Sequence, residues 1–354
     1  MNSTALIDSD VVDMMTSVFA AHCADRITPG AAVEFDENLW QVLDELGLTR
    51  LTGAESHGGS GADWHTASAL LAAASGAAVT APLVEHDLLA GWLLDTAGLP
   101  MGDGLGTAFL MDPSGTTHAV PWARHARFAV PLRLDGDRWV VAHVDADRLD
   151  IRRSENLAGE PRDTVTIEVD DVKWVPVLQG TAESFFLRGA LARVLQMCGA
   201  MERVVELCIE HVSGREQFGR ALSKFQAVQR LVSHAAAETA LARASADAAV
   251  AHVERAGWDD RASIAVAVAK SCAGHAASTV VRNAHQVHGA IGTTSEHDLH
   301  RFTRPVLAWR SEFGSVARWD RLLTKAAVDA GRDGAWSLVA HGGAVPDLLA
   351  IVRG

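Results

Sequence analysis

The sequence predicts a mostly α-helical protein in which a small central β domain separates an N-terminal helical domain from a C-terminal four-helix bundle. Apolar residues recur at helical spacing before residue 105 and after residue 178. Alanine-rich runs are frequent and tyrosine is absent, which also favours helix. Between these regions, short runs with partial alternation are separated by turn residues. We therefore expect three domains, at residues 1–104, 105–178 and 179–354.

The N-terminal domain is expected to consist of helices. Apolar positions from Val11 to Phe19 recur at helical spacing, and a second apolar stripe runs through residues 38–46. A glycine-rich loop at 55–61 follows, and two further apolar helical stretches cover 63–75 and 83–97.

The middle and C-terminal domains are distinguished by their periodicity. Alternating runs at 128–134, 139–144 and 164–169, with turn residues between them, predict a small β-barrel or sandwich. Beyond them, apolar stripes predict long helices over 187–213, 223–255 and 260–288. Together with the C-terminal segment, these three helices predict an antiparallel four-helix bundle.

The charge balance excludes a nucleic-acid-binding protein. The chain carries 31 basic and 44 acidic residues, a net charge of −13, without a basic cluster that could displace counterions. A few local arginines can still bind a phosphate on an acidic protein. We find no apolar stretch of membrane-spanning length that lacks charges, so no membrane span is expected.

The cysteines and the N-terminus favour a cytoplasmic protein. The four cysteines form no Cys-x-x-Cys pair, and Cys198 and Cys208 lie in an apolar helical pattern that predicts buried free thiols. The other two cysteines, Cys23 and Cys272, give no further signal. The acidic N-terminus lacks the basic region of a signal peptide. These features favour a reducing compartment.

A first motif lies between two predicted helices, at residues 214–220 and 224–229. Arg215 would stand at a glycine turn, where a guanidinium can bind a pyrophosphate bidentately. The free N–H groups of the helix that follows would add a favourable potential. Taken alone, a solvated loop is the more common structure for such a sequence.

A second motif, residues 286–300, ends a long helix with closely spaced glycines. Such glycines suit tight backbone that could approach a ribose or a phosphate. The four histidines in and beside it raise the question of a metal site, but their spacing matches no familiar zinc pattern. We therefore assign no metal, and expect structural or solvated histidines at His285, His288, His297 and His300.

A third motif surrounds Glu312, two residues before Gly314. A carboxylate near a glycine on a loop could act as a catalytic base, although an ordinary solvated glutamate is the simpler explanation. Singly, none of the three motifs is specific.

In combination, the motifs resemble the acyl-CoA dehydrogenase superfamily. Residues 215–219 resemble the family's R-x-x-F-G motif, which is followed by a glutamine at Gln226 here, and residues 286–292 resemble its Q-x-x-G-G-x-G motif. Residues 39–48 and 55–59 resemble the N-terminal helical domain of the family. The resemblance extends over essentially the whole chain, is strongest at 187–315 and is weakest at 105–178.

The resemblance implies an enzyme that binds FAD and acyl-CoA and desaturates the thioester between its α and β carbons. A carboxylate removes the α-proton while hydride leaves the β carbon for the flavin. In the family, the two motifs contact the FAD of a neighbouring subunit. The implied cofactor-binding residues are Arg215, Phe218, Gln226, Gln286, Gly289, Gly314 and Ser315. An electron-transfer flavoprotein is the implied electron acceptor.

Two departures from the family pattern affect the chemistry. In many family members the base directly precedes the glycine of the third motif, where this chain has Phe313, and Glu312 stands one residue earlier. Other members hold the base near the start of the first bundle helix, a position that falls near Gly189 and Ala190 here, again without a carboxylate. The second glycine of the second motif is replaced by Ala290, and the Thr-Glu-Pro segment that flanks the flavin has no clear counterpart. Retained interface motifs beside lost catalytic ones resemble the eroded subunit of actinobacterial hetero-oligomeric enzymes that degrade steroid-type acyl-CoA.

Three hypotheses follow. The chain is one subunit of such a hetero-oligomer, and completes FAD sites with a homologous subunit. Alternatively, it is a self-sufficient homo-oligomeric acyl-CoA dehydrogenase with Glu312 as the base. A third alternative is a family-like flavin oxygenase or a structural partner without dehydrogenase activity.

Overall fold

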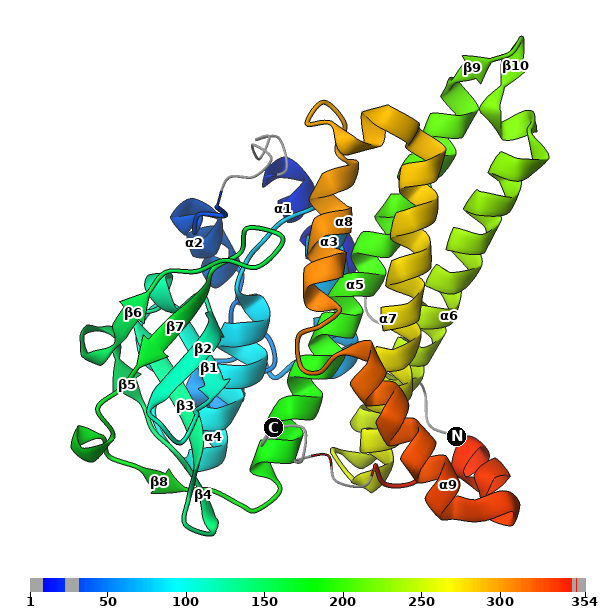
Figure 1. Ribbon diagram of the computed structural model, residues 1–354. Coiled ribbons are helices and arrows are strands. Elements are labelled where there is room, and N and C mark those ends of the chain that lie inside the picture. The colour runs from blue at the N-terminus through cyan, green and yellow to red at the C-terminus, as the bar shows by residue number, and fades with distance from the viewer. Residues whose placement is uncertain (1–8, 23–31, 346–347, 349–354) are drawn as a thin grey trace. The chain divides into compact units, whose positions relative to one another are not determined.

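The computed structural model describes residues 9–22, 32–345 and 348, and the predicted order of helices, then strands, then helices is confirmed (Figure 1). The chain divides into two compact units. The first, called the bundle unit, comprises Met1–Pro29, Trp64–Val79 and Arg193–Pro346. The second, called the sheet unit, comprises Gly30–Asp63, Thr80–Ala192 and Asp347–Gly354. Some helices of the expected N-terminal domain therefore belong to the bundle unit and others to the sheet unit. The three expected domains describe the order of elements along the chain, not the compact units. Cys23 lies outside the described residues.

The bundle unit is built from long helices that begin and end close to where the apolar stripes predict. The C-terminal segment forms two helices rather than one, and the second of them is kinked at Gly331, which has a φ of +69°. Its helices are α1 (Ser9–His22), α3 (Trp64–Gly76), the later part of α5 (Thr181–Gly214), α6 (Gln226–Ala256), α7 (Asp260–His288), α8 (Leu299–Trp309) and α9 (Val316–His341), with short turns η6 (Leu222–Lys224) and η7 (Gly289–Thr293).

Small residues allow the helices of the bundle unit to pack closely. The facing surfaces of α6 and α7 consist largely of buried alanines, and the Asn283 side chain on α7 donates to the backbone oxygen of Leu231 on α6 at 3.1 Å. Where α7 meets α9, a Cβ at Gly274 would lie 2.4 Å from Val316, so this crossing requires glycine. Polar contacts join α7 to α9 as well, since Ser271 donates to Asp320 at 2.6 Å.

Helix α7 is a long helix that contains a strongly apolar stretch. Among the described residues, the segment Asp260–Thr293 is long and apolar enough to cross a membrane, by length and composition alone. However, 61% of its most apolar window is buried inside the protein, which is the pattern of a core helix.

The sheet unit contains two small sheets around one core. The larger sheet is formed by β1 (Gly106–Leu110), β3 (Phe128–Asp135), β4 (Arg138–Val141), β5 (Val144–Asp145) and β8 (Val175–Pro176), and the smaller by β2 (Thr116–Pro121), β7 (Arg162–Thr166) and β6 (Asp150–Arg152). Strands β1 and β3 are parallel, and the other neighbours are antiparallel. Phe109, Ala129 and Val165, from both sheets, pack in the same buried cluster. This arrangement confirms the small β domain.

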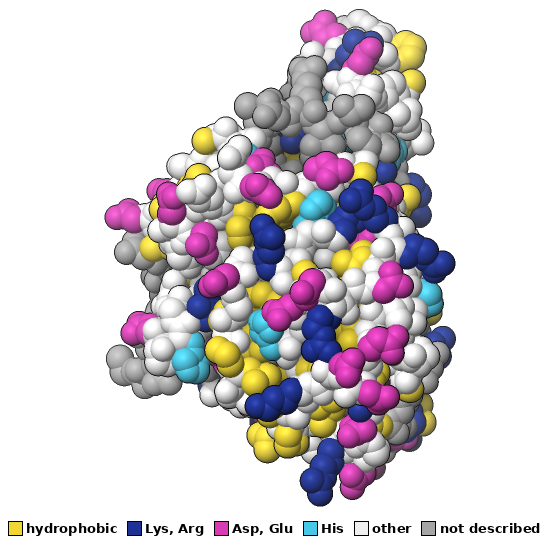
Figure 2. All heavy atoms as spheres, turned by 90° about the vertical axis from the view of Figure 1, so that its left-hand side faces the viewer, with side chains coloured by type: hydrophobic (Ala, Val, Ile, Leu, Met, Phe, Trp, Pro, Cys, Tyr) yellow, Lys and Arg dark blue, Asp and Glu magenta, His cyan; other side chains and the backbone are white. Residues whose placement is uncertain are grey.

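Three of the strands were expected with slightly different limits. The run 139–144 is divided into β4 and β5, and the run 164–169 begins earlier, ends at Thr166 and is followed by a short turn. Short helical turns in this unit are η1 (Glu55–His57), η3 (Ala123–His125), η4 (Ala146–Arg148) and η5 (Val169–Asp171). Figure 2 shows one face of the molecule, on which Lys and Arg side chains are interspersed with Asp and Glu, so that no extended field of one sign forms there.

The helices of the sheet unit include an unusual one. Helix α2 (Glu37–Glu45) begins at Asp36, whose carboxylate accepts the N–H of Leu39 at 2.9 Å. The stretch 83–97, expected as one helix, is instead a π-helix, η2 (Val84–Gly91), that continues into α4 (Trp92–Ala97). All eight residues of η2 are buried. Because π-helices are rare and are often found at functional sites, this segment is a local feature that apolar periodicity could not reveal.

The cysteine expectation is confirmed for the two predicted positions. Cys198 and Cys208 are buried free thiols on α5, and burial raises the pKa of each to about 12. Thiols with such a pKa are unreactive at neutral pH.

Candidate functional site

The first motif forms a tight hairpin at the end of α5. Strands β9 (Glu216–Gln217) and β10 (Arg220–Ala221) pair antiparallel across a two-residue turn. Phe218 and Gly219 both have positive φ, +55° and +79°, as a type I′ hairpin turn requires. Glycine adopts this conformation freely, whereas for phenylalanine it costs on the order of 1 kcal/mol. The hairpin tip, which the sequence analysis expected as a simple turn, therefore holds an aromatic ring in a strained position.

The side chains of this hairpin point outward. Phe218 is 88% exposed, and its ring meets the ring of Phe225 edge-on at a centroid distance of 6.1 Å. Arg215 is exposed, and no carboxylate of the described residues lies within ion-pair distance of its guanidinium. Gln226, the first residue of α6, is exposed as well. Three exposed side chains, a guanidinium, an aromatic ring and an amide, therefore lie near one helix end.

The second motif is also on the surface. Helix α7 ends at His288, and Gly289 terminates it with a φ of +65°. Gln286 and Gly289 are exposed, and a Cβ at Gly289 would meet nothing within 4 Å. The backbone conformation, rather than crowding within this chain, therefore requires glycine there. Ala290 is exposed too, so its methyl group lies on the surface.

The structure brings the first two motifs to the same end of the bundle unit. The ring of His211, in the last turn of α5, lies 4.5 Å from the ring of His288, in the last turn of α7. Arg215 follows His211 by one helical turn, and Gln286 precedes His288 by two residues. Of the residues expected to contact FAD, those of the first two motifs therefore lie at one end of the bundle unit, whereas Gly314 and Ser315 lie beyond α8.

Glu312 lies elsewhere in the bundle unit. Helix α8, which has 11 residues and a length of roughly 16 Å, lies between it and the short turn η7 that begins at Gly289. Its Oε2 accepts from Nε of Arg193 at 2.7 Å, and this arginine is only 2% exposed. Arg193 also donates to Gln196 at 2.7 Å. The carboxylate is thus one half of a largely buried ion pair.

A second buried cation accompanies this pair. The Nζ of Lys270 donates to the backbone oxygen of Trp309 at 3.0 Å, and its side chain is 1% exposed. Burial lowers the pKa of Lys270 to about 7, with Glu312 acting against this shift and Arg193 adding to it. Two cations therefore compete for one carboxylate.

Gly314 and Ser315, which the sequence analysis assigned to the cofactor, have local structural roles. Gly314 has a φ of +98°, and a Cβ there would lie 2.9 Å from Nε1 of Trp319. That indole nitrogen donates to the backbone oxygen of Phe313 at 3.0 Å. Ser315 is the exposed N-cap residue of α9. The position before the glycine, where the family has its base, is held by Phe313.

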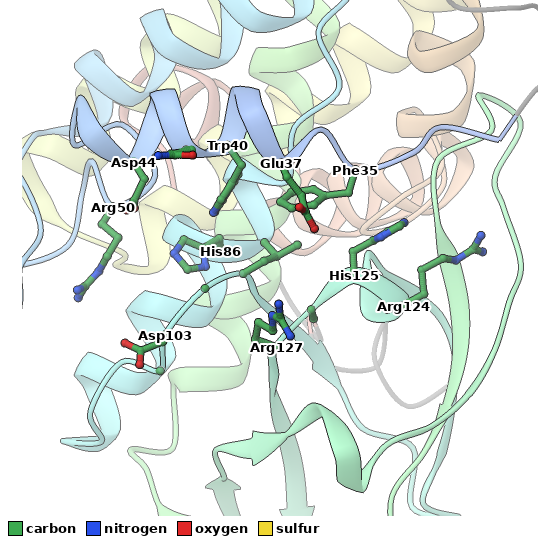
Figure 3. A pocket seen from close by; sticks show the side chains of 15 residues that line it. Phe35, Glu37, Trp40, Asp44, Arg50, His86, Asp103, Arg124, His125 and Arg127 are labelled. Atoms are coloured by element: carbon green, nitrogen blue, oxygen red, sulfur yellow. The ribbon is translucent and has the colours of Figure 1, made fainter.

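The sheet unit contains a cavity of about 680 Å³ that the sequence analysis did not identify (Figure 3). Helix α2 contributes Trp40 and Asp44, the π-helix contributes His86, and the segment after η3 contributes Arg127. The full lining is Phe35, Glu37, Trp40, Gln41, Asp44, Arg50, His86, Gly102, Asp103, Gly104, Leu105, Arg124, His125, Ala126 and Arg127. Carboxylates and guanidinium groups both line it, so its charge selects neither anions nor cations.

The polar groups of the π-helix are strongly perturbed by burial. His86 accepts the N–H of Gly106 at Nδ1 with a distance of 2.9 Å, and its ring contacts Trp40 edge-on at 5.1 Å. Burial lowers the pKa of His86 to about 3, and Arg50 contributes in the same direction. Burial raises the pKa of Asp87 to about 6, although this carboxylate accepts from the N–H and hydroxyl groups of Thr52.

Comparison with known proteins identifies the family. Residues 180–318 match the model of the acyl-CoA dehydrogenase C-terminal domain, and this range contains every predicted site residue. The chain is 27% identical over 307 residues to the acyl-CoA dehydrogenase IpdE2 of Mycobacterium tuberculosis, with 83% of this chain and 87% of that protein aligned. Residues 180–318 therefore form an acyl-CoA dehydrogenase C-terminal domain. Acyl-CoA dehydrogenases are oxidoreductases that generally depend on FAD.

Solved structures of this superfamily share the fold. The ChsE4-ChsE5 complex of Mycobacterium tuberculosis superposes with a TM-score of 0.82 at 21% identity, covering 93% of this chain and 99% of that one. The Tcur3481-Tcur3483 steroid ACAD gives a TM-score of 0.80, also at 21% identity, covering 92% and 98%. The mostly helical architecture with a small β domain is therefore that of acyl-CoA dehydrogenases.

Proposed function

We propose that this chain is one subunit of a hetero-oligomeric, FAD-dependent acyl-CoA dehydrogenase, in which a homologous subunit supplies the catalytic base. The proposal rests chiefly on one observation. The residues of the first two motifs are open at one end of the bundle unit, while the family's base position holds Phe313 and the adjacent Glu312 is tied to Arg193. The chain therefore has exposed side chains that could bind a nucleotide, but it has no carboxylate at the base position.

The open residues suit the FAD of an adjoining subunit. The guanidinium of Arg215 would bind the pyrophosphate, where two parallel N–H donors match two phosphate oxygens. The ring of Phe218 would pack on the nucleotide, which accounts for an aromatic ring exposed at a strained turn. Gln286 and the backbone at Gly289 would add hydrogen bonds. When bound, FAD accepts the hydride that leaves the β carbon of the thioester.

Glu312 is better suited to stability than to proton transfer. A general base must take up a proton from the substrate and release it again during turnover, so its pKa should lie near the working pH. An arginine at 2.7 Å stabilises the ionised carboxylate and occupies one of its oxygens. A carboxylate held in this way is a weak base with little freedom to reach a substrate.

The partner and substrate follow from the relatives. One structural relative is a two-protein complex and another is a steroid ACAD. We infer a homologous acyl-CoA dehydrogenase subunit as the partner, a steroid-type acyl-CoA as the substrate, an electron-transfer flavoprotein as the acceptor, and a cytoplasmic location.

Replacing Arg215 with alanine is expected to raise the dissociation constant for FAD of the assembled enzyme about 10- to 100-fold. The reason is that a charge-assisted hydrogen-bond pair to phosphate contributes about 1.5–3 kcal/mol. Flavin absorbance retained per subunit after gel filtration measures this. Arg255→Ala, an exposed arginine near the opposite end of α6, is the matched control and should retain its flavin. Equal flavin content in both variants would count against the assigned role.

A second candidate function, a homo-oligomeric enzyme with Glu312 as base, is favoured only by the position of this carboxylate one residue before Phe313. The variant Glu312→Gln separates the two candidates. We expect kcat per bound FAD to change less than about threefold, whereas loss of a general base typically costs at least about 100-fold. The assay should be run well below the melting temperature of the variant. A loss of that size would establish the second candidate.

A further inference from the structure

Three histidines from separate segments meet at the end of the bundle unit. His211 lies on α5, His288 ends α7, and His297 lies on the segment between η7 and α8. The ring of His288 is 4.5 Å from each of the other two rings, which are 6.2 Å apart. One ring nitrogen from each residue lies within 4.8 Å of the other two. Sequence spacing could not reveal this set, because His211 belongs to a different helix.

The central histidine presents an unused nitrogen. His288 is 5% exposed, and its Nδ1 lies 2.8 Å from the backbone oxygen of Ala284. Since a carbonyl can only accept, Nδ1 carries the proton and Nε2 keeps a lone pair in the neutral ring. This Nε2 is buried and has no hydrogen-bond partner among the described residues. A backbone carbonyl that fixes one nitrogen while the other nitrogen keeps its lone pair for a ligand is the usual arrangement of a metal-binding histidine.

The two outer histidines are half-buried and available. Each of them has a ring nitrogen within 4.8 Å of a ring nitrogen of His288. The neutral imidazole is the form that coordinates a metal.

We propose that His211, His288 and His297 form a binding site for a divalent transition-metal ion such as Zn²⁺. Three imidazoles without a carboxylate select borderline metals such as zinc, nickel or copper over magnesium or calcium. Nε2 of His288 would be the fixed ligand, and a water molecule would complete the tetrahedron. The site goes beyond the proposed function and does not depend on it.

Binding requires a small closure of the cluster. Metal–nitrogen bonds of about 2.0–2.1 Å bring ligand nitrogens closer together than they stand here. Nδ1 of His297 accepts the N–H of Leu299 at 3.0 Å, and this hydrogen bond must open for the ring to coordinate as a neutral ligand. The metal would then join the end of α5, the end of α7 and the segment before α8.

The test uses the full chain, purified with its partner subunit where it requires one, without an affinity tag and after removal of metals by a chelator. Co²⁺ is titrated while its visible absorption is followed, and Zn²⁺ is then used to displace it. We expect one ion per copy of this chain, tetrahedral cobalt absorption, and a higher melting temperature with Zn²⁺.

Variants assign the binding to the cluster. His211→Ala and His297→Ala should each weaken metal binding at least about tenfold. Loss of a group that only supports a metal ligand already has an effect of that size. His288→Phe keeps a ring in the buried position without a ligand nitrogen and should abolish binding. His234→Ala, an exposed histidine on α6 beside Glu238, is the control and should bind as the wild type does. Absence of bound metal in the wild type, or binding that survives both His288→Phe and His211→Ala, would overturn the proposal.

Discussion

Replacing Arg193 with methionine is expected to lower the free energy of unfolding by about 3 kcal/mol at pH 7. The side chain of Arg193 is 2% exposed and is bonded to Glu312 and Gln196. Methionine fills a similar volume but leaves the Glu312 carboxylate without the guanidinium. Glu312 is mostly buried, so water only partly replaces the lost ion pair. Lys270, which faces the same carboxylate, offsets part of the loss, so the effect lies at the lower end of the range for a broken buried pair. Denaturant unfolding of both proteins measures the difference.

A second arginine on the same helix provides the control for this prediction. Arg203 on α5 pairs with Glu206 and Glu210, but all three side chains are at least one-third exposed. Such surface pairs contribute at most about 1 kcal/mol, so Arg203→Met should be nearly neutral. Equal effects of the two substitutions would mean that the Arg193–Glu312 pair is not a buried structural pair, and Glu312 would again be available for catalysis.

Acidification from pH 6.5 to pH 3 is expected to remove about 4–5 kcal/mol of stability through His86 alone. The folded state holds the pKa of this histidine at about 3, whereas the unfolded chain takes up the proton near pH 6.5. The contribution of the neutral His86 ring to the free energy of unfolding is therefore fully present above pH 6.5, and it is lost as the pH falls. Asp87 acts in the opposite direction. Burial raises its pKa in the folded state to about 6. As the pH falls from 6 to 4, protonation of this carboxyl group therefore increases the free energy of unfolding by about 3 kcal/mol.

Two substitutions separate these opposing contributions. His86→Asn keeps an acceptor for the N–H of Gly106 and removes the acid-sensitive ring, so stability should rise as the pH falls below 6. Asp87→Asn retains an acceptor for Thr52 and removes the compensating group, so acid should destabilise this variant more than the wild type. Urea unfolding at several pH values gives both profiles. Parallel profiles for wild type and variants would show that neither group is buried as the structure has it.

The helices were predictable from the sequence because each has a buried apolar stripe with a period near 3.6. The limits of α7 agree with the predicted range 260–288, and those of α6 differ from the predicted range by at most three residues. Strand β1 was not predicted, since Gly106–Leu110 is buried along nearly its whole length and does not alternate. The π-helix η2 was read as an ordinary helix, because its register change leaves no mark on an apolar run.

The candidate site was predictable only in part. The motifs gave Arg215, Phe218 and Gln286, because short motifs depend on local sequence. The ion pair of Arg193 with Glu312, and the meeting of His211 with His288, depend on contacts between distant helices. One signal was nevertheless present, since Arg193 and Lys270 are charged residues on otherwise apolar helix faces, and such residues usually have a buried partner.

The most direct test of the central claim is the flavin content and mass of this chain, purified alone and co-purified with a homologous acyl-CoA dehydrogenase subunit from the same organism. We expect the isolated chain to be colourless. Together with its partner, it should form a yellow complex that contains both chains and is reduced by an acyl-CoA. If the chain purified alone carries one FAD per subunit and is reduced by an acyl-CoA, the account of a subunit that completes a shared site is wrong.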